Sequence, residues 1–137
     1  MMKNVSVLRM VAIASAMVAA ALLGTGPASA DSITYTGPAP YTYSEFVGCE
    51  GFVEMGRDDA QNPYARGSFS LGTSTRGTVC KGWLERRESP NSPFVRISAV
   101  HTVSDVTGWY WDGIPYEARV CVGDLLYSNS YSCIGSW

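Results

Sequence analysis

The sequence contains few basic residues and does not cluster them. Its 137 residues include 10 lysines and arginines against 12 acidic residues, and beyond residue 30 the only lysine is Lys81. Binding to nucleic acid requires grouped Lys and Arg side chains that neutralise phosphates. The absence of a basic stripe therefore argues against nucleic acid as a partner.

The sequence also lacks the common catalytic and metal-binding motifs. No Gly-x-Ser-x-Gly, His-Glu-x-x-His or Gly-x-x-x-x-Gly-Lys pattern occurs, and His101 is the only histidine. A triad would need a serine and Asp105 to converge on it, but Ser98 falls on the opposite face of the strand predicted there. Asp58 and Asp59 lack the spacing of an EF-hand calcium site. We therefore predict a protein that is not an enzyme and that uses no cofactor and no metal.

The first 30 residues have the pattern of a secretory signal peptide. Lys3 and Arg9 come before an apolar run at residues 10–23, and Ala28-Ser29-Ala30 supplies small residues for a cleavage site. The run is shorter than the ~20 apolar residues that span a bilayer, so a membrane anchor is the less favoured alternative. We predict a secreted, extracellular protein with no membrane attachment after cleavage. Without residues 1–30 the chain keeps eight basic and twelve acidic side chains, a net charge of −4.

All four cysteines, Cys49, Cys80, Cys121 and Cys133, lie beyond residue 30. An even number in a short exported chain indicates two disulfides, and four cysteines allow three pairings. We favour Cys49–Cys80 with Cys121–Cys133, because each joins neighbours in the sequence. No Cys-x-x-Cys occurs, so a zinc site is a weak alternative.

Alternating apolar residues predict a series of short strands. In residues 116–122, Cys121 shares a face with the charged residues, and the opposite face is apolar: Tyr116, Ala118, Val120 and Val122. Further strands are predicted at residues 45–55, 65–71, 78–88 and 94–103, with Phe69 and Trp83 in the core. Asp112-Gly113 predicts a type I′ hairpin that joins residues 109–111 to the strand ending at Val122.

Six or seven strands without a helix beyond residue 30 predict an all-β fold, a small two-sheet β-sandwich of immunoglobulin-like or Greek-key type with two disulfides. The predicted organisation is a signal peptide at residues 1–30, an extended N-terminal arm at 31–44 and a sandwich domain at 45–137. Pro38 and Pro40 keep the arm extended. The arm is either a frayed terminus or a strand that adds to a partner's sheet.

Aromatic residues are abundant: 4 Trp, 8 Tyr and 4 Phe, all beyond residue 30. Tyr and Trp are enriched at interface hot spots because they give a large contact area at low entropic cost. Two groups are the candidate binding residues: Tyr35, Tyr41 and Tyr43 in the arm, and the consecutive Trp109, Tyr110 and Trp111. Neighbours on a strand point to opposite faces, so at least one of the consecutive three should be exposed. The alternative is that these rings shield a sheet edge.

Short motifs at Cys80–Arg87 and Ala118–Val122, followed by Cys133 and Trp137, resemble small secreted actinobacterial disulfide-bonded β-domain proteins. The segment Cys80–Trp137 is also similar to the adaptor subunit of secreted umbrella toxin particles. This resemblance implies a non-catalytic connector whose N-terminal arm docks into a repeat-bearing toxin subunit while the domain holds a second subunit.

We therefore predict a secreted protein-binding adaptor module whose partners are other secreted proteins. The alternative is a proteinaceous inhibitor of a secreted hydrolase. Such an inhibitor would present residues 109–113 or the loop at 56–63 to an enzyme cleft. Sugar binding by aromatic stacking has no matching motif.

Overall fold

The computed structural model describes residues 33–134, without the side chains of residues 40–42 and 134. The predicted signal peptide and Trp137 lie outside this description. The described residues form nine β-strands: β1 (Thr34–Phe46), β2 (Cys49–Arg57), β3 (Pro63–Ser70), β4 (Cys80–Arg87), β5 (Val95–Arg96), β6 (Asp105–Val106), β7 (Tyr110–Trp111), β8 (Glu117–Asp124) and β9 (Tyr131–Ile134). Within residues 33–134 there is no helix long and apolar enough to traverse a membrane.

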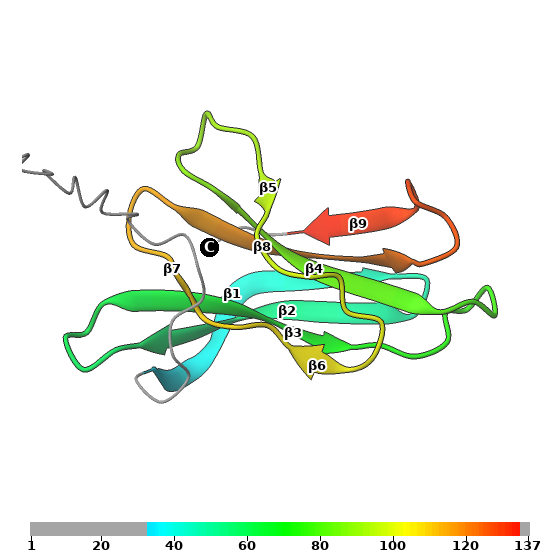
Figure 1. The fold of residues 1–137 in the computed structure, drawn as a ribbon, viewed down its shortest axis with the longest axis horizontal. Helices are drawn as coiled ribbons and strands as arrows, with labels where there is room; N and C mark the ends of the chain where they lie inside the picture. The colour runs from blue at the N-terminus through cyan, green and yellow to red at the C-terminus, as the bar shows by residue number, and fades with distance from the viewer. Residues whose placement is uncertain (1–32, 135–137) are drawn as a thin grey trace, which may run out of the picture.

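The strands form two antiparallel sheets that pack face to face (Figure 1). One sheet has the order β1-β2-β3-β6, with the short β7 also pairing with β3, and the other has the order β5-β4-β8-β9. This arrangement is an all-β, sandwich-like fold with two disulfides, as the strand pattern predicts. Stacked sheets of this kind hide one face of each strand, which explains the period-two alternation in the sequence.

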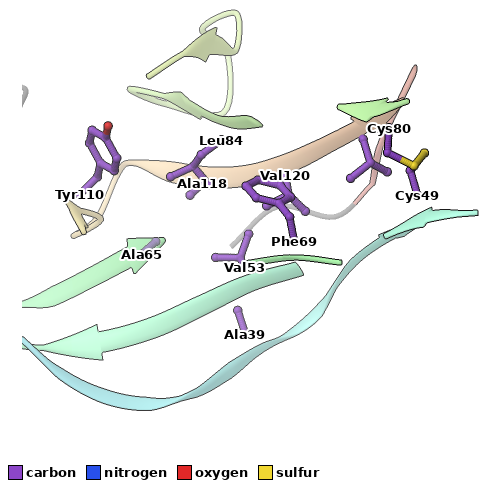
Figure 2. Packing of buried hydrophobic residues seen from close by; sticks show 11 residues of the cluster. Ala39, Cys49, Val53, Ala65, Phe69, Cys80, Leu84, Tyr110, Ala118 and Val120 are labelled. Carbon is purple, nitrogen blue, oxygen red and sulfur yellow. A yellow bond between two sulfur atoms is a disulfide. The ribbon is translucent and has the colours of Figure 1, made fainter. Parts of the chain in front are cut away.

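The core lies between the sheets and is built from small aliphatic side chains around one phenylalanine (Figure 2). The predicted inner face of β8 is confirmed for Ala118, Val120 and Val122, which are at most 1% exposed, whereas Tyr116 precedes β8 and is half-buried. Ala65 and Phe69 of β3 face them from the other sheet. Burial of Val120, Val122 or Phe69 stabilises the fold by roughly 1.5–3 kcal/mol each, and burial of an alanine methyl group by about 1 kcal/mol or less.

Phe69 lies against three glycines that come from three different strands. A Cβ atom built on Gly51, Gly67 or Gly82 would lie 2.8, 2.7 or 2.6 Å from the Phe69 ring. Side-chain atoms do not approach so closely, so the ring fills the space that three side chains would otherwise occupy. The His101 ring stacks on Phe69 with 5.6 Å between ring centroids. These glycines therefore serve packing, since none of the three has a positive φ.

We expect Gly82→Ala to destabilise the protein by about 1–3 kcal/mol, because the added methyl group overpacks the core beside Phe69. Urea denaturation of the variant and the wild type measures this difference. The matched control is Gly72→Ala, where an added Cβ meets nothing within 4 Å. Equal stability of the two glycine variants would show that the core relaxes around the methyl group.

Both predicted disulfides are confirmed, and they have different places in the fold. Cys49 of β2 bonds to Cys80 of β4, so this bridge joins the two sheets at one end of the core (Figure 2). Cys121 bonds to Cys133, its register partner on β9, on the face of β8 that points away from the core. The turn between β8 and β9 is centred near Tyr127, because Gly123 pairs with Tyr131.

The predicted boundary between an N-terminal arm and the sandwich is corrected by the pairing of β1. Residues 34–46 form a strand of the first sheet, in register with β2 from Thr34–Arg57 to Phe46–Cys49. A turn at Val47-Gly48, both at positive φ, divides the strand predicted at residues 45–55 into the ends of β1 and β2. Pro38 and Pro40 are tolerated because β1 lies at a sheet edge, where one side needs no donor.

The strand predicted over residues 94–103 is wrong for most of its length. Within residues 94–103, only β5 and a bridge from His101 to Gly82 pair with β4. Between them the amide N–H groups of Ile97 and Ser98 both donate to the Leu84 carbonyl, at 3.0 and 3.4 Å. This irregularity interrupts the alternation, and Val103 beyond it is 66% exposed; Val95, in β5 before it, is 60% exposed.

The hairpin predicted at Asp112-Gly113 is also wrong. β7 pairs with β3, whereas β8 belongs to the other sheet, so the segment between them crosses from one sheet to the other. The Tyr116 amide donates to the Gly113 carbonyl at 2.9 Å, and the Ile114–Pro115 peptide bond in this turn is cis. The pattern missed the crossover because the Asp-Gly signal carries no information about which sheet each flanking strand joins.

Candidate functional site

Two of the three candidate tyrosines of β1 present their rings to solvent. Tyr35 and Tyr43 are 49% and 50% exposed, and the side chain of Tyr41 lies outside the described residues. The Tyr43 hydroxyl donates to the Glu50 carboxylate at 2.8 Å, and this hydrogen bond raises the pKa of the phenol. Tyr35 and Tyr43 therefore belong to an edge strand of the first sheet and not to a free arm.

The consecutive aromatic residues divide between core and surface. Trp109 and Tyr110 are 4% and 7% exposed, whereas Trp111 is 37% exposed. The Arg66 guanidinium lies 4.4 Å from the Trp109 ring centroid, and burial raises the pKa of Tyr110. As the strand alternation predicts, one of the three is exposed. The Trp111 ring makes an edge contact with Tyr116 at 5.2 Å, yet Trp111 is the member of this group that offers surface.

Among residues 33–134, no serine forms a hydrogen bond with His101. Its Nδ1 lies 3.5 Å from the Asp105 carboxylate. The Ser98 hydroxyl instead donates to the Ala99 carbonyl and accepts from the Leu84 amide, each at 2.8 Å. The imidazole is half-buried and packs on the Phe69 ring.

Of the two aspartates considered as calcium ligands, Asp58 forms hydrogen bonds within the protein and Asp59 is exposed. Asp58 accepts from the Asn62 amide and side chain, both at 2.8 Å, and these bonds lower the pKa of Asp58. Glu85 lies near the sulfurs of Cys121 and Cys133. Both sulfurs belong to a disulfide, so they are not thiolate ligands.

Trp83 is buried on the outer face of its sheet, which differs from its predicted place in the core. It is 7% exposed, pairs in register with Cys121, and makes an edge contact with the Tyr131 ring at 5.1 Å. Its indole N–H donates to Glu85 at 2.9 Å. An aromatic layer therefore covers the disulfide on the side away from the core.

A group of exposed apolar side chains lies at one end of the second sheet and was not identified from the sequence. It consists of Val79, Leu125, Leu126 and Tyr127, which are 48%, 47%, 67% and 51% exposed; we call it the apolar loop surface. Val79, Leu125 and Leu126, with Thr78, line an open hollow of about 430 Å³. Contiguous exposed apolar groups of this kind are typical of interaction sites.

Hydrogen bonds hold the backbone under this surface in place. The buried Asp124 carboxylate accepts from the Thr78 hydroxyl, from the Leu126 amide at 2.9 Å and from the Ser74 hydroxyl at 3.4 Å. These bonds, with that from Thr78 the strongest, lower the pKa of Asp124. The Leu125 amide donates to the Val79 carbonyl at 2.8 Å. The loop therefore exposes apolar side chains from an ordered backbone.

Gly123-Asp124 and Ser128-Asn129-Ser130 are competing turn signals in the sequence, and the structure keeps Gly123 and Asp124 in β8 and turns after them. Leu125, Leu126 and Tyr127 are three apolar residues within a turn, where strand alternation gives them no inner face. The sequence does not predict that Val79 belongs to this surface, because Val79 lies beside Leu125 only as a result of the pairing of β4 with β8.

Asp112 is the one described residue whose buried side-chain oxygens have no hydrogen-bond partner among residues 33–134. It is 6% exposed, and both carboxylate oxygens lack a donor. Burial raises the pKa of this carboxyl to about 7; the nearby charge of Arg86 opposes the shift and that of Glu117 adds to it. The Asp112 amide donates to the Pro63 carbonyl at 3.0 Å, which fixes the residue between the sheets.

Comparison with protein-family models, curated proteins and solved structures finds no match to this chain.

Proposed function

We propose that this protein is a secreted, non-catalytic binding module that connects other exported proteins. The observation that carries the proposal is the apolar loop surface, which exposes two leucines, a valine and a tyrosine from a hydrogen-bonded backbone. Ordering a loop before binding lowers the entropic cost of association. The two disulfides and the signal-peptide pattern of residues 1–30 support export.

The finer proposal is a connector subunit of an extracellular antibacterial toxin complex. It rests on the resemblance of Cys80–Trp137 to the umbrella toxin adaptor, and the apolar loop surface falls largely inside that segment. Residues 34–46 form β1 and not a free arm. We therefore expect the toxin subunit to contact the exposed Tyr35 and Tyr43 on this edge strand. Two partners could then bind at separate places, one at β1 and one at the apolar loop surface.

We expect Leu126→Ser to weaken partner binding by about 30-fold, or about 2 kcal/mol, as for an apolar hot-spot residue. Affinity purification of the tagged protein from culture supernatant, with mass spectrometry, identifies the partner, and surface plasmon resonance then measures the affinity. Val103→Ser is the matched control, since Val103 is 66% exposed and lies outside the surface. Unchanged recovery and affinity with the Leu126 variant would contradict the proposal.

A second candidate function, inhibition of a secreted hydrolase, is favoured by the closure of the same loop. The Cys121–Cys133 bridge joins the two strands that flank Leu125–Tyr127, so the loop is short, constrained and rich in exposed side chains. Rigid loops of this kind suit an enzyme cleft because little freedom is lost on binding. Assays against secreted proteases and glycosidases separate the two functions, since an adaptor leaves their activity unchanged at micromolar concentration.

A further inference from the structure

The outer face of the second sheet carries a hollow with two positive charges. The hollow measures about 570 Å³, and its lining residues come from β4, β5, the segment after β5, the turn before β9 and β9: Lys81, Trp83, Glu85, Val95, Arg96, Val100, Ser128 and Tyr131. Lys81 is 7% exposed, whereas Arg96 is exposed. None of the ion pairs formed by residues 33–134 includes either cation.

Lys81 is held in place without a carboxylate. Its ammonium group donates to the carbonyl oxygens of Tyr127 and Ser128, each at 3.2 Å, and lies 5.7 and 6.0 Å from the rings of Trp83 and Tyr131. Two of its three N–H groups are thus used by the loop. A buried ammonium group is costly unless it is paired, so a carboxylate in the hollow would complete its surroundings.

Glu85 also lines the hollow, but its negative charge is paired with Arg119. Its carboxylate accepts from Arg119 at 2.7 Å and from the Trp83 indole at 2.9 Å. The charge that the hollow offers to a ligand is therefore positive, in a chain whose net charge beyond residue 30 is −4. This overall charge repels a polyanion such as nucleic acid, so the hollow favours an isolated acidic group.

We propose that this hollow binds an acidic side chain, Asp or Glu, from an extended segment of a partner protein. The rim contributes apolar surface, because Val95, Val100 and Tyr131 are 60%, 38% and 45% exposed. A small inorganic anion would leave that rim uncovered, whereas a peptide covers it with neighbouring side chains. The inference rests on the proposed binding function and gives the partner a chemistry. Lys81 also joins the hollow to the apolar loop surface through Tyr127.

Selection from a random peptide display library, with the exported wild-type protein as target, tests the proposal. We expect the selected peptides to share an acidic residue, and a synthetic copy with Gln or Asn in its place to bind about tenfold more weakly. Arg96→Gln should weaken binding of the acidic peptide by a similar factor. Lys81→Gln should do so as well, and Arg57→Gln, an exposed arginine on β2, should not.

NMR of the protein labelled with 13C-lysine observes the site directly, because Lys81 is the only lysine beyond residue 30. Addition of the acidic peptide should shift its Cε signal, and the Gln or Asn copy should not. Peptides without an acidic residue, no selected peptide, or equal binding to the Arg96 variant would overturn the proposal. Each of these results leaves the Leu126→Ser test of the adaptor function standing, because that test uses a different surface.

Discussion

Replacement of Asp112 by asparagine is expected to stabilise the protein at pH 8 by roughly 2–4 kcal/mol and to change its stability little near pH 4. In the folded protein, burial raises the pKa of this carboxyl to about 7 from its ordinary value of 3.8. Both oxygens lack a hydrogen-bond donor, so the charged form is poorly solvated inside the sandwich. Asparagine has nearly the same shape and never carries the charge.

The direction of the pH dependence follows from proton binding. Between pH 4 and pH 7 the folded protein holds a proton on Asp112 that the unfolded chain has released, so the free energy of unfolding falls as pH rises through this range. Well above pH 7 Asp112 is charged in both states, and its effect on the free energy of unfolding no longer changes with pH. Asp58 and Asp124 act in the opposite direction, because their lowered pKa values remove stability only as pH falls below about 4.

Urea denaturation of the wild type and of Asp112→Asn at several pH values between 4 and 8 measures this effect. The difference in unfolding free energy between the two should grow as pH rises. Asp59→Asn is the control, because Asp59 is an exposed aspartate. Parallel profiles for the wild type and the Asp112 variant would mean that the carboxylate finds solvation in the folded protein.

Loss of the bridge between the sheets is the second large effect that we expect. In the chain-entropy account, a loop of 31 residues closed by a disulfide gives about 4 kcal/mol, against about 3 kcal/mol for a loop of 12 residues. Replacing both Cys49 and Cys80 by alanine should therefore destabilise the protein by about 4 kcal/mol or more. Both cysteines are fully buried, so the shorter side chains also remove core contacts.

The comparison variant replaces Cys121 and Cys133 by alanine. These two residues lie on adjacent strands of one sheet, which the ladder from Val120 to Gly123 also holds together. We expect a smaller loss, about 3 kcal/mol, in denaturation experiments on the two double variants. If the Cys121–Cys133 variant were the less stable of the two, joining the sheets would not be the more important constraint.

Much of the fold is predictable because it depends on local alternation. The period-two patterns predict the inner faces of β8 and β3. The order of the cysteines in the chain predicts the disulfides, because each joins two consecutive cysteines. The errors arise where tertiary pairing decides the outcome. Residues 34–44 look like a free arm because prolines and polar residues dominate, yet an edge strand tolerates both.

The candidate surface was less predictable than the fold. Trp109 and Trp111 have the same side chain two positions apart, and the structure buries the first and exposes the second. Sequence alternation alone places both on one side, so it cannot tell them apart. Asp112 likewise resembles an ordinary turn residue, and its burial follows from the crossover between sheets.

The packing of Phe69 against three glycines limits which substitutions the sequence can accept at these positions. A side chain at Gly51, Gly67 or Gly82 conflicts with the ring, whereas a smaller residue at position 69 would make room for one of them. Changes at these four positions should therefore be epistatic, with an alanine that is harmful beside phenylalanine becoming tolerable beside leucine. Relatives of this chain that lose the phenylalanine are expected to lose one of the glycines with it.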